Sequence, residues 1–150
     1  QFLDMQGVPY LADVITAAIA GCAPSLILTH GTEDLNGDHR RTCEAVRVSA
    51  RPWGNYPVRR VWGFQVDPGQ SSRTHSYVEL DGSAVRFSHM AKVREALARY
   101  ASELREPPHP TSLEVVEWRR RAWGSAAGVP FAEAFEILQD IDRLAVEEDR

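Results

Sequence analysis

One short loop holds most of the side chains that could bind a metal ion or move a proton. The eleven residues that begin at His30 concentrate a polar set, namely His30, Asp34, Asn36, Asp38, His39 and Arg40. A neutral imidazole is a good zinc ligand, and a neighbouring carboxylate can orient the imidazole or accept a proton. The residue types in this loop are therefore those that a metal-dependent site would use.

A purely structural interpretation of the same loop remains open. Asp34, Asn36 and Asp38 are of the types that cap a helix, because their side-chain oxygens accept backbone N–H groups at its start. His39 would then be a solvated residue of the first helical turn. His30 either lines a pocket or bonds the backbone at the end of a strand.

The elements that position this loop follow an alternating pattern. Helical periodicity predicts helices at Val8–Ala23 and about Asp38–Ala50, and apolar or β-branched runs predict strands at Ser25–Thr29 and Val58–Val66. This order predicts an α/β layered fold with parallel crossovers. Ligands in such sheets bind beyond the carboxyl ends of the strands, and the polar loop follows directly on the first predicted strand.

The second half of the chain is less regular. A short strand is expected at Tyr77–Leu80, and an apolar stripe predicts a long helix over Met90–Leu104. The residues Thr111–Glu114 have the spacing of a capping box, which predicts the start of a helix that ends at Ala127 before Gly128. For Phe131–Leu138 the pattern leaves strand and helix equally open.

Length and composition indicate an ordinary soluble chain. The 150 residues, 43% of them hydrophobic and 25% charged, suit a single domain spanning residues 1–150. A net charge of -4 argues against a nucleic-acid partner. No apolar run approaches the roughly 20 residues that cross a bilayer, and we expect a cytoplasmic protein. Cys22 and Cys43 fall in predicted helices and are expected to be small buried residues, although a disulfide between them stays open.

The polar loop resembles part of a known family. Gly31–Arg40 contains a D-L-N-x-D-H-R run between a strand and a helix, which resembles the second signature of the PIG-L (LmbE-like) metal-dependent N-deacetylases. Further blocks follow in the family's order, namely Glu44-Ala45-Val46, Arg51-Pro52, Tyr56-Pro57-Val58, Phe64-Gln65-Val66, Pro108-His109-Pro110 and the run from Gly128 to Phe135. The resemblance implies a Rossmann-like layered α/β fold with a mainly parallel sheet flanked by helices, lacking its N-terminal strands.

The resemblance also implies an activity and roles for individual residues. Family members use a zinc-like divalent ion to activate water against an N-acetyl group, here on an N-acetylglucosamine-type sugar or conjugate. His39 would be a metal ligand, and Asp38 would support the active-site imidazoles or the oxyanion. Asn36 replaces a histidine found in several relatives and would steady the oxyanion through its amide. Substrate contacts are expected from Arg40, His30 and His109.

One part of the family pattern is absent. The first signature, a His-Pro-Asp-Asp-Glu type motif that supplies the other two metal ligands and the general base, does not occur in this sequence. The only histidine followed by proline is His109, and the next residue is Thr111; its prolines also suit a rigid turn. Because catalytic zinc normally takes three protein ligands, His39 alone is not a complete site. The sequence begins at Gln1, and we expect an upstream segment, on the same precursor or a companion chain, to complete it.

A non-catalytic alternative belongs to a different class of function. A degenerate family member would bind a carbohydrate or a protein without hydrolysis, and the missing motif together with Asn36 favours this. The intact Asp38-His39-Arg40 triplet favours the enzyme. A chain without its first strands would expose a sheet edge, so we expect it to form homo-oligomers or to require its missing half. No residue selects a particular N-acetylated substrate.

Overall fold

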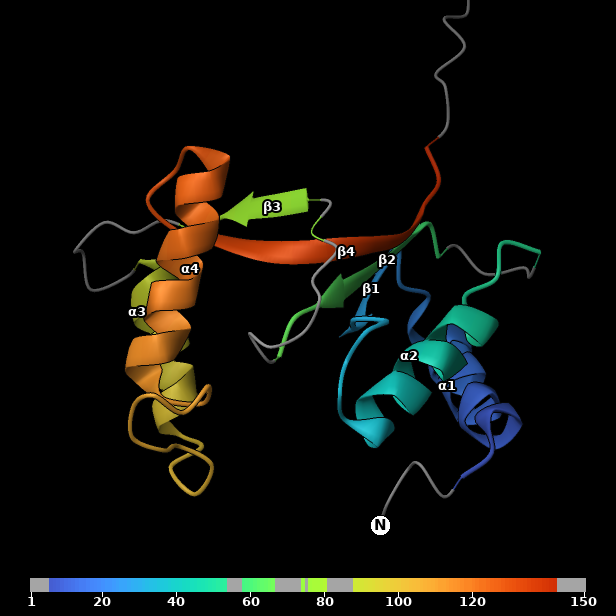
Figure 1. Ribbon diagram of the computed structural model, residues 1–150. Coiled ribbons are helices and arrows are strands. Elements are labelled where there is room, and N and C mark those ends of the chain that lie inside the picture. Colours follow the sequence, from blue (N-terminus) through green and yellow to red (C-terminus); the bar gives the residue numbers. More distant parts are fainter. Residues whose placement is uncertain (1–5, 54–57, 67–73, 75, 81–87, 143–150) are drawn as a thin grey trace, which may run out of the picture. The chain divides into compact units, whose positions relative to one another are not determined.

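The computed structural model describes residues 6–53, 58–66, 74, 76–80 and 88–142 (Figure 1). The described residues form four helices and a four-stranded mixed sheet of order β1-β2-β4-β3. This confirms the predicted α/β class. The chain divides into two compact units, the first made of residues 1–64 and 136–150 and the second of residues 65–135.

The first unit contains the alternating elements predicted for the first half of the chain. They are α1 (Val8–Cys22), β1 (Leu26–His30), α2 (Gly37–Ser49) and β2 (Arg60–Phe64), each within two residues of its predicted ends. Strands β1 and β2 are parallel, and their register sets His30 opposite Phe64 at the carboxyl ends. The polar loop therefore leaves the sheet at the end where α/β proteins bind ligands.

The core of the first unit lies between its two helices and its strands. Helices α1 and α2 pack against each other (Figure 1), and Ser49 of α2 donates a hydrogen bond to the carbonyl of Ala12 in α1, 2.9 Å away. The buried cluster draws on both helices and on the sheet, through Ile19, Val46, Ala50, Val58 and Val61. These apolar stripes explain the helical periodicity of the sequence.

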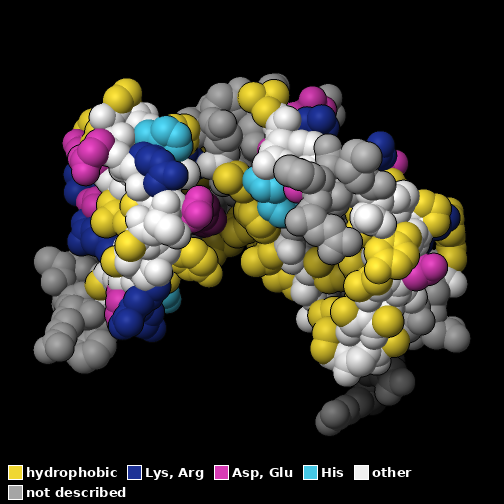
Figure 2. Space-filling view, turned by 90° about the horizontal axis from the view of Figure 1, so that it is seen from below, with side chains coloured by type: hydrophobic (Ala, Val, Ile, Leu, Met, Phe, Trp, Pro, Cys, Tyr) yellow, Lys and Arg dark blue, Asp and Glu magenta, His cyan; other side chains and the backbone are white. Residues whose placement is uncertain are grey.

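Strand β1 has one buried face and one exposed face. Ile27 packs against the core and Thr29 is buried, whereas Leu26 is 38% and Leu28 is 52% exposed. Successive side chains of a strand point to opposite faces, so the exposed leucines share one face. Strand β1 is also the edge of the described sheet. Parallel strands are usually covered on both faces, but these two leucines at the edge of the described sheet are exposed. Hydrophobic side chains at the surface are coloured yellow in Figure 2.

The second unit contains a short strand and two helices. Strand β3 (Ser76–Glu79) runs antiparallel to β4 (Ala132–Asp140), with Ser76 opposite Phe135. Helices α3 (His89–Ala98) and α4 (Leu113–Ala127) are linked by Arg94, whose Nε donates to Glu117 at 2.9 Å. Gly128 ends α4 in the left-handed region, at φ 73°, as its position after the last helical residue predicted.

Some local predictions for the second unit need correction. Helix α3 ends at Ala98 instead of Leu104, because the following amides bond to carbonyls three residues back and tighten the turn. The cap of α4 is Ser112, which accepts a bond from the amide of Val115, and not Thr111, whose hydroxyl donates to the carbonyl of Glu103. The stretch Phe131–Leu138, for which the sequence pattern left strand and helix equally open, lies almost entirely in strand β4.

The cysteines and the helices bear on two other predictions. Both cysteines lie in helices and are free, but only Cys43 is buried; Cys22, at the end of α1, is exposed, which corrects the expectation that both are buried. Among the described residues, no helix is both long enough and apolar enough to span a membrane.

Candidate functional site

The candidate site occupies the turn from the end of β1 into α2. His30 is the last residue of β1, and Asn36 caps α2 with its side-chain oxygen, which accepts a bond from the amide of Asp38 at 2.9 Å. The capping role considered for Asn36 is therefore confirmed. A cap at this position starts the helix so that Asp38 and His39 fall in its first turn.

A buried carboxylate holds the imidazole of His39. Nδ1 of His39 lies 2.8 Å from Oδ2 of Asp34, whose side chain is 3% exposed, while that of His39 is 26% exposed. The other carboxylate oxygen of Asp34 accepts the amide of Asn36 at 2.9 Å, and Arg40 donates to the backbone carbonyl of Asp34 at 2.6 Å. A carboxylate on Nδ1 fixes the ring and leaves Nε2 as the nitrogen that can bind a metal.

The second imidazole lies flat on the first. The rings of His30 and His39 stack with their centroids 4.0 Å apart and their planes inclined by 13°, and Phe64 contacts the His30 ring at 4.9 Å. Burial lowers the pKa of His30, its electrostatic interaction with the neighbouring His39 lowers it further, and the Asp34 carboxylate partly offsets both. Within the described residues, the buried Nδ1 of His30 has no hydrogen-bond partner.

The stacked geometry limits how the two histidines can bind an ion. An imidazole coordinates through a lone pair in its ring plane, about 2.0 Å from zinc. The two planes are nearly parallel and separated, so one ion cannot lie in both. In this arrangement only one of the two rings could hold a given ion, and the other ring lies flat against it.

A second buried carboxylate fastens the start of the loop. Glu136, on the part of β4 that belongs to the first unit, is 8% exposed and accepts from both the amide and the hydroxyl of Thr32, at 2.9 and 2.7 Å. A Cβ on Gly63 would lie 3.1 Å from the Cα of Gly31. The loop therefore crosses β2 so closely that a larger residue at Gly63 would press on its backbone. Glu136 had no signal in the sequence, because its partner lies 104 residues away.

The remaining predicted residues have different surroundings. The residue bonded to the His39 ring is Asp34, for which the sequence suggested only a capping role. Asp38 is the second residue of α2, and its backbone carbonyl accepts the Thr42 hydroxyl at 2.8 Å. His109 belongs to the second unit, where Nδ1 lies 2.9 Å from the hydroxyl of Thr111 in an exposed turn. The structure thus brings His30, Arg40 and His39 together around Asp34.

The donor set fits one ligand of a metal site and its support. His39 and Asp34 have the arrangement of a ligand with an orienting carboxylate. No group of three or more histidine, cysteine or acidic side chains among the described residues could hold an ion. The described residues therefore include a histidine that could serve as one zinc ligand, and they do not form a complete zinc site.

Comparison with known proteins shows the fold and no closer relationship. No protein-family model and no curated protein matches the chain. Among solved structures, the A40926 pseudoaglycone deacetylase Dbv21 has a TM-score of 0.64 and 21% identity over 91% of this chain and 58% of its own. A deacetylase of teicoplanin biosynthesis has 0.64 and 19%, over 93% and 56%. The 4-carboxy-2-hydroxymuconate hydratase GalB of Pseudomonas putida KT2440 has 0.60 and 15%, over 94% and 64%.

These similarities define a class of fold. The chain is structurally similar to part of the LmbE-like deacetylases, which agrees with the fold implied by the resemblance in the polar loop. It spans about six tenths of the length of the structures that it matches. The hydratase has the same fold, so the fold alone does not select a reaction.

Proposed function

We propose that this chain is the later part of a zinc-dependent N-deacetylase that removes an N-acetyl group from an N-acetylglucosamine-type sugar or conjugate. The observation that supports this most is the contact between the His39 imidazole and the buried Asp34 carboxylate, inside a D-L-N-x-D-H-R run. Two of the similar solved structures are deacetylases.

The residues of the loop have separate roles in the proposed reaction. A bound zinc ion would polarise the acetamide carbonyl and lower the pKa of bound water. His39 would hold the ion, and Asp34 keeps its ring oriented. Asp38 and Asn36 are proposed to act at the oxyanion. Arg40, His30 and His109 are proposed to contact the sugar.

The proposed zinc site needs two ligands besides His39. We expect the other two zinc ligands from a segment upstream of Gln1 or from a companion chain, since His39 is the single ligand described here. The exposed edge of β1, with Leu26 and Leu28 uncovered, is where a further parallel strand would add to the sheet. Without that segment the same edge would favour self-association into homo-oligomers.

The proposal is tested on the protein that includes the upstream segment. Zinc content and acetate release from N-acetylglucosamine conjugates are measured for the native protein, for His39→Ala and for His89→Ala. His89 is a matched control because it is an exposed histidine of α3 in the second unit. We expect His39→Ala to lose zinc and activity together and His89→Ala to keep both. Zinc at unchanged stoichiometry in His39→Ala would exclude the ligand role.

A binding module without catalysis is the second candidate. Asn36 favours it, because an amide cannot serve as a general acid, and so does the single metal ligand among the described residues. Such a module would bind an N-acetylglucosamine conjugate with the same affinity in the presence and absence of a metal chelator, and would release no acetate. Chelator-sensitive acetate release separates the enzyme from the module.

The compartment is proposed from the cysteines. Cys22 and Cys43 are both free, and free thiols are usual in the reducing cytoplasm. We therefore propose a cytoplasmic protein. Fractionation of the native host cells would check this, and recovery outside the cytoplasm would contradict it.

A further inference from the structure

The His39 imidazole has one neighbour at its edge and another against its face. Asp34 lies at the edge, where its Oδ2 is 2.8 Å from Nδ1 of the ring. His30 lies against the face, because the two ring centroids are 4.0 Å apart and the two planes are inclined by only 13°. A hydrogen bond to a ring nitrogen lies near the ring plane, whereas a stacked ring lies across it. The two contacts therefore restrain different motions of the His39 ring.

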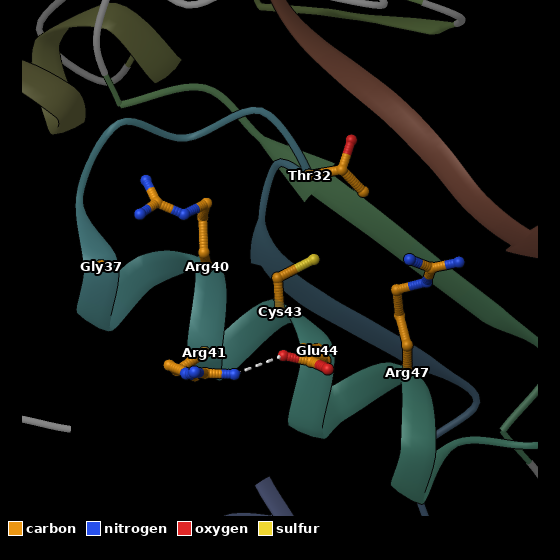
Figure 3. A pocket seen from close by; sticks show the side chains of 7 residues that line it. All are labelled: Thr32, Gly37, Arg40, Arg41, Cys43, Glu44 and Arg47. Carbon is orange, nitrogen blue, oxygen red and sulfur yellow. Dashed lines mark hydrogen bonds and ion pairs between the residues drawn. The ribbon is translucent and has the colours of Figure 1, made fainter. Parts of the chain in front are cut away.

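The contact at the edge is well anchored but leaves one motion free. The Asp34 carboxylate accepts the amide of Asn36 at 2.9 Å, and the Asp34 carbonyl accepts from Arg40 at 2.6 Å. Figure 3 shows Arg40, which lines a cavity of about 550 Å³ beside the loop, directed from α2 toward that loop. A fixed carboxylate sets the direction of the Nδ1 edge, but the ring can still turn about the line from Nδ1 to Oδ2. The tilt of the ring therefore depends on what lies against its face.

The contact on the face is set by the sheet. His30 is the last residue of β1, and the parallel register places it opposite Phe64, the last residue of β2. The His30 ring also contacts the Phe64 ring, with the two centroids 4.9 Å apart. Regular elements hold a side chain more precisely than loops do. The position of the His30 ring therefore follows from strand pairing, although the ring that it touches belongs to α2.

The contact between the two rings depends on the shape of the His30 ring. Its Nδ1 is buried and has no hydrogen-bond partner among the residues that the structure describes. A buried polar atom without a partner destabilises the folded chain, so this nitrogen does not account for the packing of the ring. Phenylalanine has a flat ring without that polar atom. It should therefore keep the stack, whereas a side chain without a flat face should lose it.

We propose that His30 is a positioning residue for His39, whose ring plane it sets by stacking against it. An imidazole binds a metal through a lone pair in its ring plane, so a tilt of the ring would turn Nε2 away from the ion. This inference rests on the proposed zinc site and deepens it, because it states what holds the zinc ligand in place. The role differs from the sugar contact proposed above for His30, since a hydrogen bond to the sugar would use a ring nitrogen.

The proposal is tested in the protein with its upstream segment, by competition titration of zinc and by the KM for N-acetylglucosamine conjugates. His30→Ala should weaken zinc binding by about tenfold, the lower end of the range for groups that orient a ligating histidine. His30→Phe should bind zinc within about threefold of the native protein, because it keeps a flat ring against His39. A loss of zinc affinity in His30→Phe as large as in His30→Ala would overturn the proposal. So would native zinc affinity in both variants with a raised KM, since that result indicates a sugar contact alone.

The matched control is Ile27→Val, which removes one methyl group from the core side of the same strand. Ile27 packs against the buried cluster of the first unit, so this variant measures how a general loss of stability affects zinc binding. It should bind zinc within about twofold of the native protein, because the loss of one core methyl group leaves the fold intact. Equal weakening in Ile27→Val and His30→Ala would overturn the proposal.

Two further variants keep the outcomes distinct. If His30→Ala fails to fold, His30→Leu replaces it, because leucine fills the volume without a flat face; native zinc affinity in His30→Leu would overturn the proposal. His39→Ala separates this inference from the proposed function. If His39→Ala loses zinc and His30→Ala does not, the positioning role alone is wrong. If His39→Ala keeps zinc, the ligand assignment is wrong and the positioning role is wrong with it.

Discussion

The largely buried carboxylates of the two units have different bonding partners. In the first unit, Asp34 bonds the His39 imidazole and Glu136 bonds the amide and hydroxyl of Thr32. In the second unit, the carboxylates face arginines: Glu117 bonds Arg94 and Arg121, and Glu133 lies 2.7 Å from Arg120.

The carboxylates of the first unit therefore orient neighbouring side chains, whereas those of the second unit form ion pairs. The negative charge of a carboxylate that is paired with a guanidinium group is balanced by that group, and the ion pair connects two secondary-structure elements. A buried carboxylate that accepts from an imidazole or a hydroxyl instead fixes the orientation of that donor. The first unit therefore has the groups expected of a reactive site, and the second has those of a scaffold.

The largest expected effect is on metal binding. Asp34→Asn in the protein with its upstream segment should weaken zinc binding roughly 10–100-fold, the range found when an outer carboxylate behind a ligating histidine is changed. Glu133→Gln, a sheltered carboxylate of the second unit, should leave zinc affinity unchanged. Competition titration against a zinc chelator measures both. Equal losses in the two variants would remove the distinction between the units.

The next effect concerns stability. Glu136→Gln replaces an acceptor of two bonds to Thr32 with a side chain that offers one acceptor oxygen, and should lower the free energy of unfolding by about 1–3 kcal/mol. Glu133→Gln should cost less, because burial already raises the pKa of Glu133 and so disfavours its charged form. Urea unfolding of both variants tests this order. A larger loss in Glu133→Gln would reverse it.

A smaller effect appears at acid pH. The hydrogen bond from Arg94 holds the pKa of Glu117 below its ordinary value. The unfolded chain then binds more protons, so the stability from Glu117 is complete above the ordinary pKa and is lost as pH falls through the lowered one. Glu117→Gln should therefore flatten the acid side of the stability curve, by less than about 1 kcal/mol because the partner is exposed. An unchanged curve would show that the pair is not formed in solution.

The last prediction concerns the reactivity of the two cysteines and needs no amino-acid substitution. Cys43 is buried with a raised pKa, whereas Cys22 is exposed. Since the thiolate is the reactive form, a native chain at neutral pH should react quickly with one equivalent of a thiol reagent, at Cys22. Peptide mapping by mass spectrometry identifies the site. Fast labelling of Cys43 would mean that the interior of the first unit opens readily.

The fold of the first unit was largely predictable because its signals are local. Apolar periodicity set α1 and α2, and short apolar runs set β1 and β2, each within two residues. The second unit was harder. Helix α3 keeps an apolar pattern past Ala98, where the backbone has already left the helix. A run such as Ala132–Asp140 becomes a strand through pairing with a distant segment, which periodicity does not record.

The position of the candidate site in the chain was predictable from the sequence, but only some of the contacts within the site were. The crowded loop located it, and the capping preference of Asn36 was visible in the sequence. That Asp34 rather than Asp38 bonds the His39 ring depends on the backbone path between them. The stacking of His30 on His39 depends on how the loop returns over the sheet. Glu136 reaches Thr32 from the far end of the chain, and no local pattern could have shown it.

The cap at the start of α2 also fixes which way one amide faces. The atom of Asn36 that approaches the amide of Asp38 must be its oxygen, because a backbone N–H can only donate. The NH2 group of Asn36 is therefore turned away from the helix. A serine or aspartate would start the helix equally well, but neither carries this NH2 group. Helix initiation thereby fixes the direction of an NH2 group three residues before His39 in the sequence.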